Sequence, residues 1–159
     1  MWSVADCAAR LGVALVLLTS APGPAAELDQ HGREHPWQGP LGRVTVIDFA
    51  ASWCAPCRTT LPRLAELAAR FPQIGVLVVS VDDRVEGRDA LIRDLGLELS
   101  VIWDRDDRIA EHYRPAGMPA TVVLDEQGAV VHSHVGSGAK EWRRLIEVVE
   151  SLVVTSSTR

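Results

Sequence analysis

Short β-rich runs alternate with helical segments along most of this chain, and this alternation constrains the fold more than any other feature. The order predicted from Arg43 onward is strand, helix, strand, helix, strand, helix, strand, strand, helix. The predicted strands are VTVIDFA, IGVLVVSV, LSVIW, ATVVL and AVVHSHV. Strands that are separated by helices form a sheet covered by helices on both faces. The last two strands flank the turn DEQG, which predicts an antiparallel hairpin, so we expect a central mixed sheet of the α/β class.

The helices are predicted from apolar residues that recur three and four positions apart. The segment after the first strand has this spacing at Leu61, Leu64, Ala68 and Phe71, and a second helix is expected to stop at Gly96. A short helix is predicted in DDRIAEHY. The last helix carries one apolar stripe, formed by Trp142, Leu145, Ile146, Val149, Leu152 and Val153.

Length and charge restrict the function classes. A chain of 159 residues suits a single domain, and three cysteines are too few for a scaffold built on disulfides. The net charge of −5 is spread along the chain, which excludes the strongly basic face that nucleic-acid binding requires.

The N-terminal residues have the pattern of an export signal. An uncharged run, LGVALVLLTSAPGPAA, follows Arg10 and ends in small residues and prolines, which predicts a signal peptide over residues 1–26. An uncleaved membrane anchor is the alternative. Residues 27–40, rich in glycine and proline, are expected to form a linker, residues 41–154 the domain, and residues 155–159 a tail.

The stretch DFAASWCAPCRTTLP, residues 48–62, places two cysteines two residues apart. Cys54 is expected at the end of a strand and in the first turn of the next helix, where free N–H groups and the helix dipole favour a thiolate. Pro56 suits the opening turn of a helix. Cys57 lies one turn deeper and can reach the Cys54 sulfur. The result is one exposed, acidic thiol and one shielded thiol, as dithiol–disulfide exchange requires.

A metal site and a structural disulfide are the competing interpretations of this pair. Zinc usually takes four protein ligands, and His132 and His134 are the nearby candidates, without a second pair of cysteines. His31 and His35 are expected to be exposed to solvent. A disulfide across so short a loop gains little from chain entropy. We therefore expect redox exchange, with no metal and no cofactor.

The chain resembles the thioredoxin fold and, within it, the TlpA-like and ResA-like group of exported thiol–disulfide oxidoreductases. The resemblance covers about residues 41–154 and is carried by WCAPC, by Pro62 five residues after Cys57, and by the segment GMPATVVLD with Pro119. The long stretch between Pro62 and Pro119 resembles the helix-and-strand insertion of the TlpA-like group.

This resemblance implies roles for individual residues. Asp48 would be buried, as its apolar neighbours Ile47 and Phe49 also indicate. By the resemblance it would act as a base toward Cys57, with Asp83 as a second carboxylate that could assist. Pro119 would follow a cis peptide bond, which would leave the backbone of Met118 free to pair with an extended substrate. It would also block metal capture by the dithiol. Trp53 would be a flat contact surface for substrates, together with the two residues between the cysteines, Ala55 and Pro56.

The expected activity is reduction of protein disulfides outside the cytoplasm, in the periplasm or an equivalent compartment. Ala55 and Pro56 bring neither a charge nor a side-chain donor to the Cys54 sulfur, which favours a reductant over a strong oxidant. A membrane thiol carrier is the implied electron donor, and cytochrome c maturation is one possible setting. The alternatives are a disulfide-forming oxidant and a peroxidase of the peroxiredoxin type.

Overall fold

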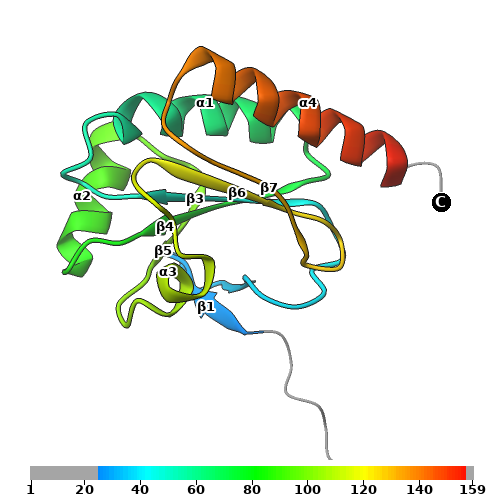
Figure 1. Ribbon diagram of the computed structural model, residues 1–159. Coiled ribbons are helices and arrows are strands. Elements are labelled where there is room, and N and C mark those ends of the chain that lie inside the picture. The colour runs from blue at the N-terminus through cyan, green and yellow to red at the C-terminus, as the bar shows by residue number, and fades with distance from the viewer. Residues whose placement is uncertain (1–24, 157–159) are drawn as a thin grey trace, which may run out of the picture.

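A mixed sheet of order β5-β4-β3-β6-β7 forms the centre of the computed structural model, which describes residues 25–156 (Figure 1). Strands β3, β4 and β5 are parallel, and β6 and β7 are antiparallel to their neighbours. The strand bounds are Thr45–Ala50 for β3, Gly75–Ser80 for β4, Ser100–Trp103 for β5, Ala120–Leu124 for β6 and Val130–Val135 for β7. These five strands, and the hairpin at the end, confirm the pattern predicted from the sequence.

Strand β3 lies in the middle of the sheet, and all six of its residues are buried. Because successive side chains of a strand point to opposite faces, Val46, Asp48 and Ala50 share one face. Val46 and Ala50 belong to one apolar core cluster, and Ile47 and Phe49 belong to the other. The single carboxylate of this strand is therefore enclosed within the first cluster.

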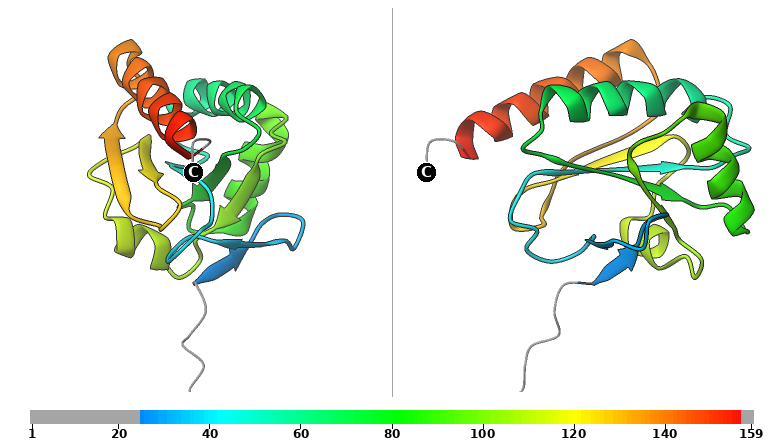
Figure 2. Two further views of the ribbon diagram at one scale, coloured as in Figure 1. Left: turned by 90° about the vertical axis from the view of Figure 1, so that its right-hand side faces the viewer. Right: turned by 180° about the vertical axis from the view of Figure 1, so that it is seen from behind.

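Helices cover the two faces unequally (Figure 2). Helices α1 and α4 lie side by side over one face, with α2 beside α1, whereas α3 lies on the opposite face. The helix bounds are Cys57–Arg70 for α1, Val85–Leu95 for α2, Arg108–Tyr113 for α3 and Ala139–Ser156 for α4. As predicted, α2 is followed by Gly96, in the left-handed conformation that glycine adopts readily. Helix α4 extends into the residues expected to be a tail.

The segment expected to be a linker folds instead onto the domain. Strand β1 (Ala26–Leu28) pairs antiparallel with β2 (Glu34–Pro36), and Trp37 follows with only 3% of its surface exposed. The hydroxyl of Tyr113 in α3 donates to the Trp37 carbonyl. Trp37 thus anchors the segment to the face of the sheet opposite α1.

Asp29 explains why this glycine-rich segment is ordered. Its fully buried carboxylate accepts hydrogen bonds from the backbone N–H groups of His31 and Arg33 at 2.8 and 3.0 Å. The Arg33 guanidinium donates to the same carboxylate, and the His35 ring nitrogen lies 2.9 Å from it. His31 is exposed as expected, whereas His35 is half-buried because it packs against this carboxylate.

The same segment covers one edge of the sheet. The Gln30 amide donates to the Leu99 carbonyl at 2.9 Å and accepts from the Val101 N–H at 2.7 Å. The edge strand β5 is therefore capped by side-chain hydrogen bonds, which an alternation of residue types does not reveal.

The signal peptide, the membrane anchor and the TlpA-type insertion all stay predictions. The predicted signal peptide or anchor falls on residues 1–26, of which 1–24, with Cys7, lie outside the described residues. Within residues 25–156, no helix combines the length and apolar character needed to cross a membrane. The stretch between Pro62 and Pro119 holds β4, α2, β5 and α3, and assigning part of it to a TlpA-type insertion stays a prediction.

Candidate active site

Cys54 and Cys57 form a disulfide where β3 ends and α1 begins, with Cα atoms 5.3 Å apart. Cys57 is fully buried and Cys54 keeps 4% of its surface exposed. The prediction of an exposed first thiol therefore needs correction for the oxidised state, because the Cys54 sulfur is bonded to a partner that lies inside the core. Cys54 is nevertheless the more accessible of the two cysteines, as predicted.

Helix α1 begins later than predicted. Its first residue is Cys57 and Pro56 is the capping residue, so Cys54 precedes the helix. The reason is that four-residue turns open the segment, with Cys57 N–H bonding to the Cys54 carbonyl at 3.1 Å and Arg58 N–H to that of Ala55 at 3.2 Å. The Cys57 N–H also lies 3.3 Å from the Cys54 sulfur. A backbone donor therefore faces this sulfur although the regular helix starts further on.

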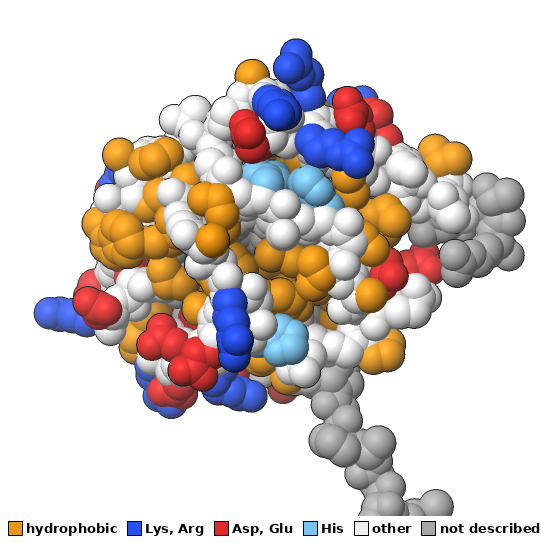
Figure 3. All heavy atoms as spheres, viewed as in Figure 1, with side chains coloured by type: hydrophobic (Ala, Val, Ile, Leu, Met, Phe, Trp, Pro, Cys, Tyr) orange, Lys and Arg blue, Asp and Glu red, His pale blue; other side chains and the backbone are white. Residues whose placement is uncertain are grey.

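The surface around the disulfide is apolar. Trp53 is 67% exposed, and Ala55 and Pro56 are also exposed. Figure 3 shows hydrophobic side chains gathered at this end of the molecule, where β3 runs into α1. Such exposed apolar groups beside a reactive bond suit contact with another protein.

Asp48 is completely buried in β3. The Thr121 hydroxyl in β6 donates to Asp48 Oδ1 at 2.7 Å, whereas Oδ2 has no hydrogen-bond partner among the described residues. Burial raises the pKa of Asp48 to about 7, and the Thr121 hydrogen bond only partly opposes this rise. A carboxyl group that titrates near neutrality can both accept and return a proton under ordinary conditions.

Asp48 and the two cysteines lie on the same side of the sheet. Cys54 and Cys57 belong to the core cluster that contains Val46 and Ala50, the neighbours of Asp48 on its face of β3. This is the side covered by α1. The carboxylate therefore lies in the apolar layer beneath the helix that begins with Cys57.

Pro119 follows a cis peptide bond from Met118, as the resemblance implied. Because β6 runs antiparallel to β3, the start of β6 lies beside the end of β3, where Phe49 pairs with Ala120. Pro119 is buried, and Met118 is half-buried and packs against the cluster that includes both cysteines. The fold thus brings this segment to the same end of the molecule as the disulfide.

Two carboxylates follow strand β4, and the structure separates them. Asp83 is exposed, whereas Asp82 is 6% exposed and accepts hydrogen bonds from Ser52, two residues before Cys54. The sequence pointed to Asp83 and did not single out Asp82. The signal that could have found it is the pair of adjacent carboxylates at a strand end, one of which must point inward.

His132 and His134 lie together on β7, with Nε2 of the first 3.1 Å from Nδ1 of the second. Partial burial lowers the pKa of both imidazoles. Across residues 25–156 no group of three or more histidine, cysteine or acidic residues is arranged to hold a metal ion.

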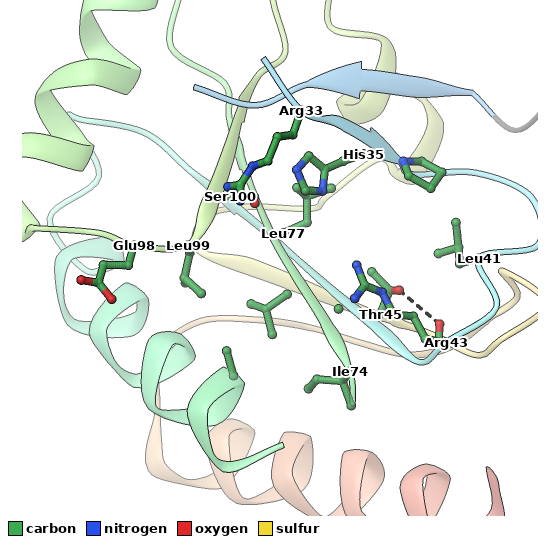
Figure 4. A pocket seen from close by; sticks show the side chains of 14 residues that line it. Arg33, His35, Leu41, Arg43, Thr45, Ile74, Leu77, Glu98, Leu99 and Ser100 are labelled. Atoms are coloured by element: carbon green, nitrogen blue, oxygen red, sulfur yellow. Dashed lines mark hydrogen bonds between the residues drawn. The ribbon is translucent and has the colours of Figure 1, made fainter. Parts of the chain in front are cut away.

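A separate cavity of about 240 Å³ lies at the far end of the sheet (Figure 4). Thr45, the first residue of β3, lines it together with Arg33, His35 and Arg43. Cys54 follows the last residue of β3, so this cavity is remote from the disulfide.

Comparison with known proteins agrees with this geometry. The model of the AhpC/TSA family matches residues 19–133. A thioredoxin H-type of Fagopyrum esculentum is 36% identical over 107 residues, which cover 67% of this chain and 72% of that protein. The thiol–disulfide oxidoreductase ResA of Geobacillus thermodenitrificans is 29% identical over 115 residues, covering 71% of this chain and 66% of that protein.

A solved structure assigned to the thiol:disulfide interchange protein DsbE of Chlorobium tepidum has the same fold. Its TM-score is 0.73 at 24% identity, and the match covers 80% of this chain and 92% of that one. The chain belongs to the AhpC/TSA family, and the thioredoxin fold with a paired Cys54 and Cys57 makes it a thiol–disulfide oxidoreductase.

Proposed function

We propose that this protein reduces disulfides of other proteins outside the cytoplasm, through the dithiol form of Cys54 and Cys57. The observation that carries the proposal is the neutral surrounding of the Cys54 sulfur. The intervening residues, Ala55 and Pro56, have no charged or hydrogen-bonding side chain, and the donor that faces this sulfur is the Cys57 N–H at 3.3 Å. A strong oxidant needs its reduced form specially stabilised, which a single backbone donor does not provide.

The exchange proceeds in two steps, formation of a mixed disulfide and its resolution. The Cys54 thiolate attacks one sulfur of the substrate disulfide, which forms a mixed disulfide and releases the other substrate sulfur as a thiolate. Asp48 then takes the proton of Cys57, directly or through a water, and the Cys57 thiolate attacks the Cys54 sulfur. The Cys54–Cys57 bond forms and the second substrate sulfur leaves. Two electrons have passed from the enzyme to the substrate.

The apolar surface beside the disulfide serves to bind the substrate. Trp53, Ala55 and Pro56 offer exposed area around Cys54. Met118 precedes Pro119 at the same end of the sheet, where its backbone pairs with an extended segment of the substrate. Protein substrates therefore fit this site better than small disulfides.

Export is part of the proposal. It is supported by the uncharged run before Glu27, which has the form of a signal peptide, and by the resemblance to the exported ResA-like group. In an oxidising compartment the oxidised enzyme has to be reduced again, and a membrane thiol carrier that supplies two electrons fulfils this need.

The redox potential tests the direction of electron flow. Equilibration of the purified protein with glutathione buffers, followed by tryptophan fluorescence, should give a value nearer about −270 mV than about −120 mV. A value above about −150 mV would make the protein an oxidant. A parallel assay with insulin and a thiol donor should show turnover, and the same enzyme should fail to consume hydrogen peroxide.

A further inference from the structure

We propose that Asp82 is a positioning residue for the dithiol–disulfide exchange, acting through Ser52 on the turn that carries Cys54. In this role Asp82 determines how firmly the turn is held, whichever way electrons flow and wherever the protein works.

Asp82 lies at the same end of the sheet as the disulfide. Strand β4 ends at Ser80 and runs parallel to β3, so the two strands end side by side, with Ala50 paired to Ser80. The Val81 N–H donates to the Ala50 carbonyl at 3.0 Å and extends this pairing beyond β4. The next residue, Asp82, is therefore adjacent to the chain that leaves β3 toward Cys54.

The Asp82 carboxylate holds Ser52 by both its backbone and its side chain. The Ser52 N–H lies 3.1 Å from each carboxylate oxygen, and the Ser52 hydroxyl donates to Oδ1 at 2.7 Å. The Ser80 hydroxyl donates to Oδ2 at 2.9 Å. Three donors thus converge on two oxygens, and two of the three belong to the turn.

Helix α2 and the side chain of Trp103 also restrict the position of Asp82. A Cβ atom at Gly87 in α2 would lie 2.4 Å from Asp82 Cγ, so this helix approaches the carboxylate as closely as glycine permits. The Trp103 indole N–H donates to the Asp82 carbonyl at 2.8 Å. Asp82 has little freedom to move away from Ser52.

The fold itself does not require a carboxylate at position 82. The side-chain partners of Asp82 in the described part of the chain are a backbone amide and two hydroxyls, all neutral. Burying a carboxylate among neutral partners is costlier than burying an amide of the same shape. The stronger hydrogen bonds that a charged acceptor makes are the gain, and they act on the turn before Cys54.

A firmly held turn favours the disulfide. Closure of the Cys54–Cys57 bond depends on how often the two sulfurs meet, which is an effective concentration set by the rigidity of the turn. If Ser52 is released, the reduced form gains more freedom than the oxidised form, in which the bond itself holds the sulfurs together. Loss of the Asp82 contacts should therefore lower the equilibrium constant for disulfide formation.

The first test is Asp82→Asn in a glutathione equilibrium. We expect the constant for disulfide formation to fall about tenfold, equivalent to a potential about 30 mV less negative. Asp89→Asn is the matched control, because it removes the same charge from an exposed position of α2 that pairs with Arg88. This control should stay within twofold of the wild type.

The second test separates positioning from simple support of the fold. In the unfolded chain Asp82 does not affect the cysteines, so any change in the equilibrium constant must equal the difference in destabilisation between oxidised and reduced proteins. Denaturant unfolding of both forms of Asp82→Asn should show a larger loss of stability in the oxidised form. Equal losses in both forms, with an unchanged equilibrium constant, would overturn the proposal.

If Asp82→Asn does not fold, two further variants test whether Asp82 positions the cysteines. Ser52→Ala removes the hydroxyl donor, and Gly87→Ala places a Cβ where the carboxylate now lies. Both should lower the equilibrium constant in the same direction as Asp82→Asn, and Gly87→Ala should do so although alanine is the better helix former. If both fold and keep the wild-type constant within twofold, Asp82 does not position the cysteines.

Discussion

Asp48 in β3 and Thr121 in β6 are direct partners across the antiparallel pair, and the Thr121 hydroxyl donates to Asp48 Oδ1 at 2.7 Å. The second oxygen of this fully buried carboxylate has no hydrogen-bond partner among residues 25–156. Half of the carboxylate is thus satisfied and half is not. A group in this condition destabilises the fold when it is charged, and such groups in native proteins usually have a chemical purpose.

The first prediction is that Asp48→Asn stabilises the protein at high pH. The pKa of Asp48 is raised from 3.8 to about 7 on folding, so the unfolded chain releases this proton first and stability falls as pH climbs from about 4 to about 7. Relative to Asp48→Asn, the wild type should lose about 2–3 kcal/mol between pH 5 and pH 8. Denaturant melts of both proteins at these two pH values measure this difference. An Asp48→Asn protein less stable than the wild type at pH 8 would contradict the prediction.

A second prediction concerns the resolving step. If ionised Asp48 removes the Cys57 proton, release of a thiol from a preformed mixed disulfide at Cys54 should accelerate with pH around an inflection near 7. Asp48→Asn should abolish this inflection and slow the step about 100-fold at pH 7. Single-turnover release of a chromophoric thiol provides the profile.

The variant Thr121→Val tests whether the inflection belongs to Asp48. The Thr121 hydrogen bond lowers the pKa of Asp48, so its removal should move the inflection to higher pH without abolishing it. A profile of Asp48→Asn that matches the wild type would show that another group accepts the proton.

The fold was predictable because local sequence patterns and the final packing agree. The strands β3 to β7 are short runs rich in β-branched residues and the four helices have apolar stripes, so each of these elements could be placed to within a few residues, unlike β1 and β2. The pair of cysteines and Pro119 were predictable from motifs. Their meeting at one end of the sheet follows from the antiparallel pairing of β6 with β3.

The features that could not be predicted depend on contacts between distant positions. Asp29 orders the N-terminal hairpin through side-chain and turn hydrogen bonds that have no periodicity. Which of Asp82 and Asp83 points inward depends on Ser52, thirty residues earlier. Helix α1 starts later than expected because the sequence does not distinguish the four-residue turns around Cys54 from the first turn of a helix.

A third prediction tests the role of this hairpin. Asp29→Ala removes a fully buried acceptor and leaves two backbone N–H groups without it, so we expect a loss of about 1–3 kcal/mol in unfolding free energy. The glutathione equilibrium constant should not change, because Asp29 contacts the edge strand β5, which β4 separates from the strand that leads to Cys54. Glu34→Ala, an exposed change in β2, is the control. A stability within about 0.5 kcal/mol of the wild type would mean that the hairpin adds little to the domain.

The fourth prediction assigns the two cysteines. Cys57→Ser should accumulate a mixed disulfide with a protein substrate at Cys54, because the fully buried position 57 then lacks the thiol that resolves it. Cys54→Ser should form no such adduct and should lose activity. Mass spectrometry after reaction with an oxidised substrate detects the adduct. Trapping by Cys54→Ser, and not by Cys57→Ser, would reverse the roles.

The last prediction is that Trp53 contributes to binding protein substrates and not to the chemistry. Its side chain is 67% exposed next to Cys54, so Trp53→Ala should change the unfolding free energy by less than about 0.5 kcal/mol. The KM for insulin should rise about tenfold with kcat nearly unchanged, since an exposed tryptophan at an interface often supplies more than about 1 kcal/mol. The rate with a small disulfide, which cannot span this surface, should stay at the wild-type value.

Leu28→Ala is the control for Trp53→Ala, because Leu28 is a large hydrophobic side chain, 54% exposed, in strand β1 of the N-terminal hairpin. It removes exposed apolar surface beside the edge strand β5, which β4 separates from β3, and should leave the KM for insulin unchanged. An equal rise in KM for both variants would indicate non-specific hydrophobic association. An equal loss of rate with protein and small disulfides in Trp53→Ala would place Trp53 in the reaction itself, because only an effect on the reacting sulfurs is common to both substrates.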